Sequence, residues 1–166
     1  MDIELLYATR GRRPLPWRLS LSRTIRCNLS CADLNARPEG KDVAALSYAT
    51  VGSNRLEDAK RFYDALLAGL GIPPLFEHPS GGRVYGRDGL PNFAVLGPFD
   101  GAPATIGNGS MFAFRCETRA EVAWFHATAL SLGGQCEGRP GIRGPDWYFT
   151  YVRDLDGNKL CAFCTE

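Results

Sequence analysis

Cysteines and histidines are the residues of this chain whose chemistry could support a metal or redox site. The last two of its six cysteines, Cys161 and Cys164, form a Cys-x-x-Cys pair within the stretch RDLDGNKLCAFC. At the start of a helix such a pair can hold a metal ion or cycle between thiol and disulfide. Here the pair falls in the apolar run 159–165, which predicts a strand. Residues three apart in a strand point to opposite faces, so we expect neither a disulfide nor a shared ion.

The other cysteines and the histidines add no metal site. Cys27 and Cys31 have the spacing of the first two cysteines of an iron–sulfur triplet, but the third position is Leu34. His78 falls in a predicted strand or loop, and His126 lies on a predicted helix that packs on a sheet. We expect structural or surface roles for both histidines, and we expect no metal and no cofactor.

The composition is that of an ordinary globular protein. The chain has 166 residues, of which 45% are hydrophobic and 22% charged, enough for one domain with a sizeable core. A net charge of +1 gives no general attraction to nucleic acid. No apolar run of about 18 residues predicts a membrane span, and no apolar signal segment indicates secretion. We therefore expect reduced thiols and a cytoplasmic location.

Residues 1–43 differ in kind from the rest. They carry eight Lys and Arg against five Asp and Glu, and they show no sustained helical or strand period. We interpret them as an irregular or disordered extension, or as non-native sequence added by an upstream start. The arginine- and serine-rich composition leaves an organelle transit peptide as an alternative.

Residues 44–166 contain one order of predicted elements twice. In the first copy a strand and a helix are followed by three strands, at 44–52, 55–71, 74–78, 82–87 and 92–97. In the second copy they fall at 110–117, 118–134, 135–138, 146–154 and 159–165. Asn54 and Thr118 are the predicted helix N-caps. Tyr48 to Met111 and Phe62 to Phe125 are both 63 residues apart. This spacing predicts two tandem βαβββ modules, about 44–98 and 110–166, in one α+β domain.

This duplication resembles the vicinal oxygen chelate superfamily, which includes glyoxalase I, extradiol dioxygenases, and bleomycin- and fosfomycin-resistance proteins. The stretches that carry the resemblance are DAKRFYDALLAGLGI, NGSMFAFRCETRAEVAWFHA and YVRDLDGNKLCAFC. The resemblance covers residues 44–166 and implies two modules whose mixed sheet curls around a central cleft. It also implies a small-molecule ligand and a possible homodimer.

In the resembled enzymes a divalent metal is held by one side chain from the first and last strand of each module. Carried onto this sequence, those four slots fall at Tyr48, Phe93, Met111 and Cys161. Such metals prefer carboxylate or imidazole ligands, and of the four residues only Cys161 is a credible ligand. The resemblance thus implies the fold while this residue set argues against the metal chemistry.

We therefore expect a metal-free cleft that binds a small hydrophobic or planar molecule. Tyr48, Phe93 and Met111 would form its floor, with Arg115 and Cys161 beside them. A metal-dependent lyase or dioxygenase of the same superfamily is one alternative, and a scaffold without a ligand is another. Metal-free catalysis would need Cys161 as nucleophile, with no histidine placed to activate it.

Near the end of the chain, the predicted strand 146–154 carries an aromatic run. Alternation places Trp147, Phe149 and Tyr151 on one face and Tyr148 on the other. Either set could line the cleft or pack under the helices.

Overall fold

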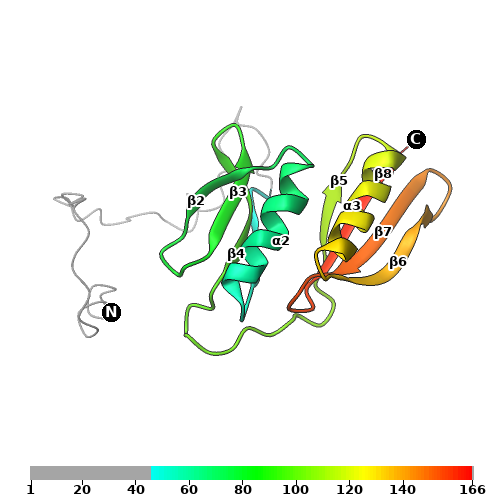
Figure 1. Ribbon diagram of the computed structural model, residues 1–166. Helices are drawn as coiled ribbons and strands as arrows, with labels where there is room; N and C mark the ends of the chain where they lie inside the picture. Colours follow the sequence, from blue (N-terminus) through cyan, green and yellow to red (C-terminus); the bar gives the residue numbers. More distant parts are fainter. Residues whose placement is uncertain (1–45, 166) are drawn as a thin grey trace, which may run out of the picture. The chain divides into compact units, whose positions relative to one another are not determined.

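The computed structural model describes residues 46–165 (Figure 1). Our predictions for the extension 1–43 and for Cys27 and Cys31 fall outside the described residues. Within the described part, two βαβββ modules follow one another, and each has one helix packed on one face of a four-stranded sheet (Figure 1). The predicted α+β fold with an internal repeat is confirmed.

The first module forms a mixed sheet in the order β1-β4-β3-β2. Strand β1 runs parallel to β4, and the other pairs are antiparallel. Its elements are β1 (Ala49–Gly52), α2 (Leu56–Ala68), β2 (Pro74–Glu77), β3 (Arg83–Arg87) and β4 (Leu90–Leu96).

The second module repeats this topology in the order β5-β8-β7-β6, with β5 parallel to β8. Its elements are β5 (Phe112–Arg115), α3 (Arg119–Ser131), β6 (Gln135–Ile142), β7 (Trp147–Arg153) and β8 (Lys159–Thr165). No strand pairing joins the two sheets in the described part of the chain, so β1 and β5 each remain an edge strand of their own sheet.

Strand β6 runs to Ile142, four residues further than predicted, because it keeps pairing with β7 through two register irregularities. Such irregularities leave residues unpaired without ending the ladder.

The two helices begin differently. Thr118 caps α3 as predicted, and its hydroxyl accepts a hydrogen bond from the Glu121 amide at 3.2 Å. The prediction for Asn54 is wrong, because α2 has Arg55 at its N-cap position with no side-chain cap. The amide group of Asn54 instead forms two hydrogen bonds, of 2.7 and 2.9 Å, with the backbone of Ala104. Asn54 therefore holds the linker between the modules and not the helix end.

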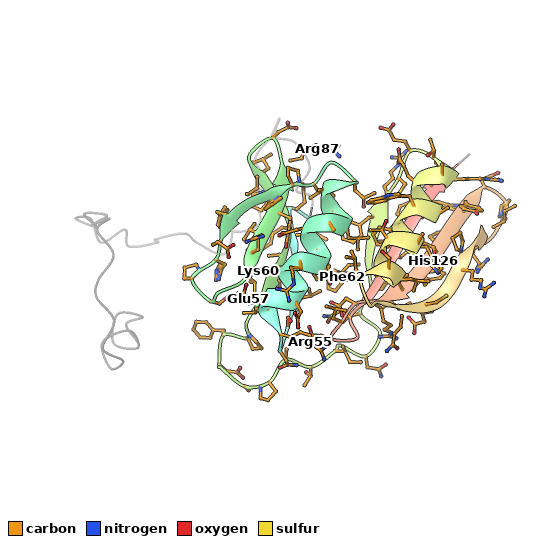
Figure 2. The ribbon with its side chains drawn as sticks, in the orientation of Figure 1. Arg55, Glu57, Lys60, Phe62, Arg87 and His126 are labelled. Atoms are coloured by element: carbon orange, nitrogen blue, oxygen red, sulfur yellow. The ribbon has the colours of Figure 1, made fainter. Side chains whose placement is uncertain are left out.

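At its other end, α2 is held by a side chain from the sheet. Arg87 at the end of β3 donates to the carbonyls of Leu70 and Gly71 at 2.9 and 3.1 Å, and Figure 2 shows it near that end of the helix. Leu70 and Gly71 follow the last helical residue, Ala68, so the guanidinium satisfies carbonyls of the turn after α2 and places a positive charge near the negative end of the helix dipole.

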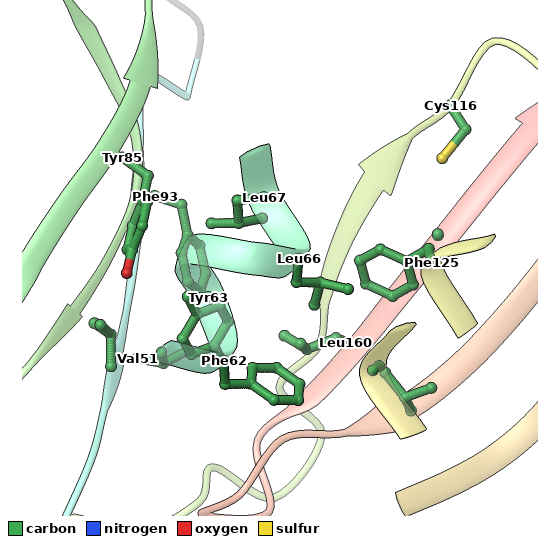
Figure 3. Close-up of a cluster of buried hydrophobic side chains, with 14 of the residues drawn as sticks. Val51, Phe62, Tyr63, Leu66, Leu67, Tyr85, Phe93, Cys116, Phe125 and Leu160 are labelled. Carbon is green, nitrogen blue, oxygen red and sulfur yellow. The ribbon is translucent and has the colours of Figure 1, made fainter. Parts of the chain in front are cut away.

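Buried side chains from both modules form one core (Figure 3). The ring of Tyr63 on α2 lies 5.1 Å from that of Phe93 on β4, and Phe93 in turn lies 5.8 and 5.6 Å from Phe112 and Phe114 on β5. The helices also meet, since a Cβ built on Gly69 would lie within 2 Å of the Trp124 ring. The modules therefore share one packed interior.

The turn between β7 and β8 also ties the modules together. Asp156 accepts from the Ser53 hydroxyl at 2.6 Å and from the Asn54 amide at 2.9 Å. Asn158 donates to the carbonyl of Gly52 at 3.1 Å. Buried Asp154 accepts a 2.6 Å hydrogen bond from the hydroxyl of Tyr63. The DLDGN stretch of the second module is thus bonded to the first strand and helix of the first.

Candidate ligand-binding site

A pocket of about 350 Å³ lies between the start of β1, the middle of β4 and strand β5. Its wall includes four of the five residues predicted from the sequence, namely Tyr48, Phe93, Met111 and Arg115, together with Asn92. This volume is within the range of small-molecule sites. The fold therefore brings together side chains from positions as far apart as 48 and 115.

Three of these predicted residues present accessible side chains. Tyr48 and Met111 are 53% and 43% exposed, and each lies just before the first strand of its module. Arg115 is exposed at the end of β5 and makes no ion pair or hydrogen bond with another residue of the described part. The pocket thus offers a phenol, a thioether and a guanidinium to a ligand.

Phe93 borders the pocket, but its ring is buried in the core against Tyr63. The strand registers explain why. Ala49 of β1 pairs with Phe93 in the first module. Phe112 of β5 occupies the position of Ala49 in the second module, and it pairs with Leu160. Phe93 therefore corresponds to Leu160, and Cys161 corresponds to Ala94. The metal slot inferred at Phe93 is one residue out of register, and Ala94 offers no ligand either.

Cys161 lies on the sheet face away from α3 and is fully buried. It is not part of the pocket wall. Burial raises the pKa of its thiol to about 11, with the Cys116 thiol adding to the shift. A protonated, buried thiol is a poor nucleophile. Cys164 belongs to the core on the opposite face, as the strand periodicity predicts.

The residues at the four family slots do not fit a divalent metal. They are Tyr48, Ala94 in the corrected register, Met111 and Cys161, which lack a carboxylate and an imidazole. In the described part of the chain no three His, Cys, Asp or Glu side chains gather into a possible metal site.

Both histidines have local partners. The Nδ1 atom of His78 lies 3.0 Å from the hydroxyl of Ser80. His126 lies on α3 (Figure 2), and its Nε2 is 3.3 Å from the thiol sulfur of Cys136 on β6. Burial, with a contribution from the Arg139 charge, lowers the pKa of His126, which favours the neutral ring at pH 7. The proximity of Cys136 to His126 could not be read from the sequence.

The aromatic run of β7 supplies a second surface beside the pocket. Val152 on the same strand belongs to the core under α3, so Trp147, Phe149 and Tyr151 face the other way. They stack in a row with ring centroids 5.6 and 5.9 Å apart. Phe163 of β8 lies 5.4 Å from Phe149. We call these four residues the aromatic row. The alternation of side chains along the predicted strand grouped Trp147, Phe149 and Tyr151 together, but it did not show which face of the sheet they occupy.

No helix in residues 46–165 is long and apolar enough to cross a membrane.

Two βαβββ modules with parallel first and last strands define the fold of the vicinal oxygen chelate superfamily. Within it, the chain belongs to the glyoxalase/bleomycin resistance protein family. It is 41% identical to a glyoxalase/bleomycin resistance protein from Albidiferax ferrireducens T118, and the match covers 73% of this chain and 98% of that one with a TM-score of 0.67.

More distant structures share the fold. A glyoxalase-related enzyme from Fulvimarina pelagi is 23% identical over 74% of this chain and 89% of its own, with a TM-score of 0.59. A genomically encoded fosfomycin resistance protein from Listeria monocytogenes is 15% identical over 75% of this chain and 96% of its own, with a TM-score of 0.57. No family model and no curated protein matches the chain.

Proposed function

We propose that this protein binds a small hydrophobic or planar molecule in the pocket between β1, β4 and β5, without a metal ion. The observation that carries the proposal is the pocket wall itself, where Tyr48, Met111 and Arg115 are exposed around a volume of about 350 Å³. Aromatic and thioether groups provide contact area, and a phenol and a guanidinium can orient a ligand. Membership of a family that includes resistance proteins is consistent with binding as the function.

A thermal-shift screen with planar hydrophobic compounds tests this proposal, because a ligand that binds only the native state raises its melting temperature. The double variant Tyr48→Ala, Met111→Ala should lose the shift. Phe76→Ala is the matched control, because Phe76 is also 53% exposed and lies on β2, outside the pocket. If no compound shifts the wild-type protein, or if both variants respond equally, the pocket is not the binding site.

The competing metal-dependent function has its own test. Metal analysis of protein purified without chelator should find less than stoichiometric nickel, zinc, manganese or iron. A stoichiometric metal that disappears in Cys161→Ala would overturn the metal-free proposal.

We also propose a homodimer, a cytoplasmic location, and a domain that begins at residue 44. The homodimer rests on the family, in which dimers are frequent. Sedimentation velocity of the full chain tests it, and a single species at the mass of 18.2 kDa would refute it.

A further inference from the structure

The aromatic row and Arg115 occupy one face of the second sheet. Arg115 pairs in register with Phe163, and Phe163 with Phe149, so the three residues lie side by side on neighbouring strands. Neighbouring strands are about 4.8 Å apart, so the Arg115 backbone lies roughly 10 Å from that of Phe149. Arg115 also lines the proposed pocket, so this one residue borders both the pocket and the aromatic row.

The rings of the row are accessible. Trp147 is 42% exposed, and Phe149, Tyr151 and Phe163 are half-buried. Neighbouring rings are close to parallel and stacked on one another, with interplanar angles of 21° between Trp147 and Phe149 and 7° between Phe149 and Tyr151. The row therefore presents a continuous, partly exposed aromatic surface against which an apolar molecule can pack.

The charges on this face are unequal. At one end, Lys159 lies 5.2 Å from the Tyr151 ring centroid and 3.3 Å from a carboxylate oxygen of Glu137. Arg153 donates to the other oxygen of Glu137 at 2.6 Å. Glu137 therefore forms an ion pair with both cations, although its single negative charge leaves this group one net positive charge. Arg115 at the other side has no such partner among the described residues. Arg115 is therefore a cation without a paired carboxylate among the described residues, and it lies beside the pocket.

We infer that the ligand is a planar aromatic anion, whose rings pack against the aromatic row and whose carboxylate or similar acidic group pairs with Arg115. A guanidinium binds a carboxylate through two parallel hydrogen bonds. A two-ring aromatic acid has the length to reach from Phe149 across Phe163 to Arg115. This inference rests on the proposed binding function and adds the chemical class of the ligand.

Calorimetric titration of the full chain with 2-naphthoate and with its uncharged analogue 2-naphthamide tests the inference. Wild-type protein should bind 2-naphthoate about tenfold more tightly, as expected for a hydrogen bond to a charged group. Arg115→Gln should abolish this preference, whereas Arg61→Gln, the same charge change on the exposed face of α2, should leave it within twofold. Phe149→Leu should weaken binding of both probes about fivefold or more, because the naphthalene rings of both probes pack against the same aromatic surface.

The outcomes separate the two proposals. If both probes bind the wild-type protein equally, and Arg115→Gln changes neither, the anionic class is refuted while binding of a planar molecule stands. If neither probe binds and the thermal-shift screen is also empty, the proposed function itself fails. If Arg115→Gln or Phe149→Leu instead converts a dimer to a monomer in sedimentation velocity, the face is covered by a second copy, and the ligand inference is overturned.

Discussion

The hydrogen bond between Tyr63 and Asp154 is the most deeply buried polar link between the modules. The hydroxyl of Tyr63 on α2 donates to Asp154 before the β7–β8 turn at 2.6 Å, and Tyr63 and Asp154 are 0% and 4% exposed. The same carboxylate accepts from the Asp156 amide and from the amide and side chain of Asn158, at 2.7–3.0 Å. Tyr63→Phe removes only the bond that crosses between modules.

The cost of Tyr63→Phe can be estimated from these contacts. A hydrogen bond to a charged group contributes about 1.5–3 kcal/mol to stability. The ring stays in place, because it packs against Phe62 and Phe93 at 5.2 and 5.1 Å, so no cavity term is added. For a domain of this size, we expect the melting temperature to fall by roughly 6–12 °C.

Urea denaturation and calorimetry measure this loss, with Tyr148→Phe as the control. Tyr148 is half-buried on β7, and its hydroxyl has no hydrogen bond within residues 46–165, so we expect its change to stay within about 0.5 kcal/mol. A cycle with Asp154→Asn should give a coupling of about 0.5–3 kcal/mol. If Tyr63→Phe is no more destabilising than Tyr148→Phe, the bond does not hold the modules together.

Three further predictions concern packing and the thiols. Gly69→Ala should destabilise by about 1–3 kcal/mol, because the added methyl group meets the ring of Trp124, and Trp124→Ala should relieve most of that clash. The free energy of unfolding should fall from about pH 9 towards pH 11. Burial raises the pKa of the Cys116 and Cys161 thiols to about 11 in the folded state, so between these pH values the thiols ionise in the unfolded chain but stay protonated in the folded one. Iodoacetamide should modify Cys136 first among the described cysteines, because the others are buried.

These predictions have direct controls. Gly89→Ala has no atom within 4 Å of the added methyl group but a positive φ of 76°, so it measures backbone strain without a clash. Chemical denaturation at pH 8, 9.5 and 11 measures the thiol effect, which should reach about 2–3 kcal/mol for each thiol. Stability that is flat over this range contradicts it. Peptide mass mapping locates the alkylated cysteine, and early labelling of Cys116 or Cys161 contradicts the burial argument.

The elements of the fold could be predicted because their signals are local. Strand β8 was expected at residues 159–165 and is found there. Helix α3 begins after Thr118, as its capping pattern indicates. Such features depend on residues within a few positions of one another, which periodicity and capping rules describe. The internal repeat could be predicted for the same reason, because both modules carry the same order of local strand and helix patterns.

The sheet face on which the Phe93 side chain lies could not be predicted from neighbouring residues in the sequence. The family resemblance assigned Phe93 and Cys161 to equivalent slots, but the β3–β4 pairing contains an irregularity between Tyr85 and Gly86. One extra residue moves every later side chain to the other face of the sheet. The sequence does not show this irregularity, and it decides whether the ring faces the core or the open surface. The Asn54 prediction failed similarly, because the linker that competes for its side chain lies 50 residues away.

The stretch RDLDGNKLCAFC shows why a sequence can indicate a fold more clearly than a ligand. The side chains of Asp154, Asp156 and Asn158 are all used in hydrogen bonds within the turn or to the first module. A chain that joins its modules in this way needs those side chains whatever it binds. Cys161 and Phe163 face away from the helices and make no such bonds, so the joining of the modules does not depend on their side chains. The alternate residues of β5, β7 and β8 that face away from the helices, among them Arg115 and the aromatic row, take no part in these bonds between the modules.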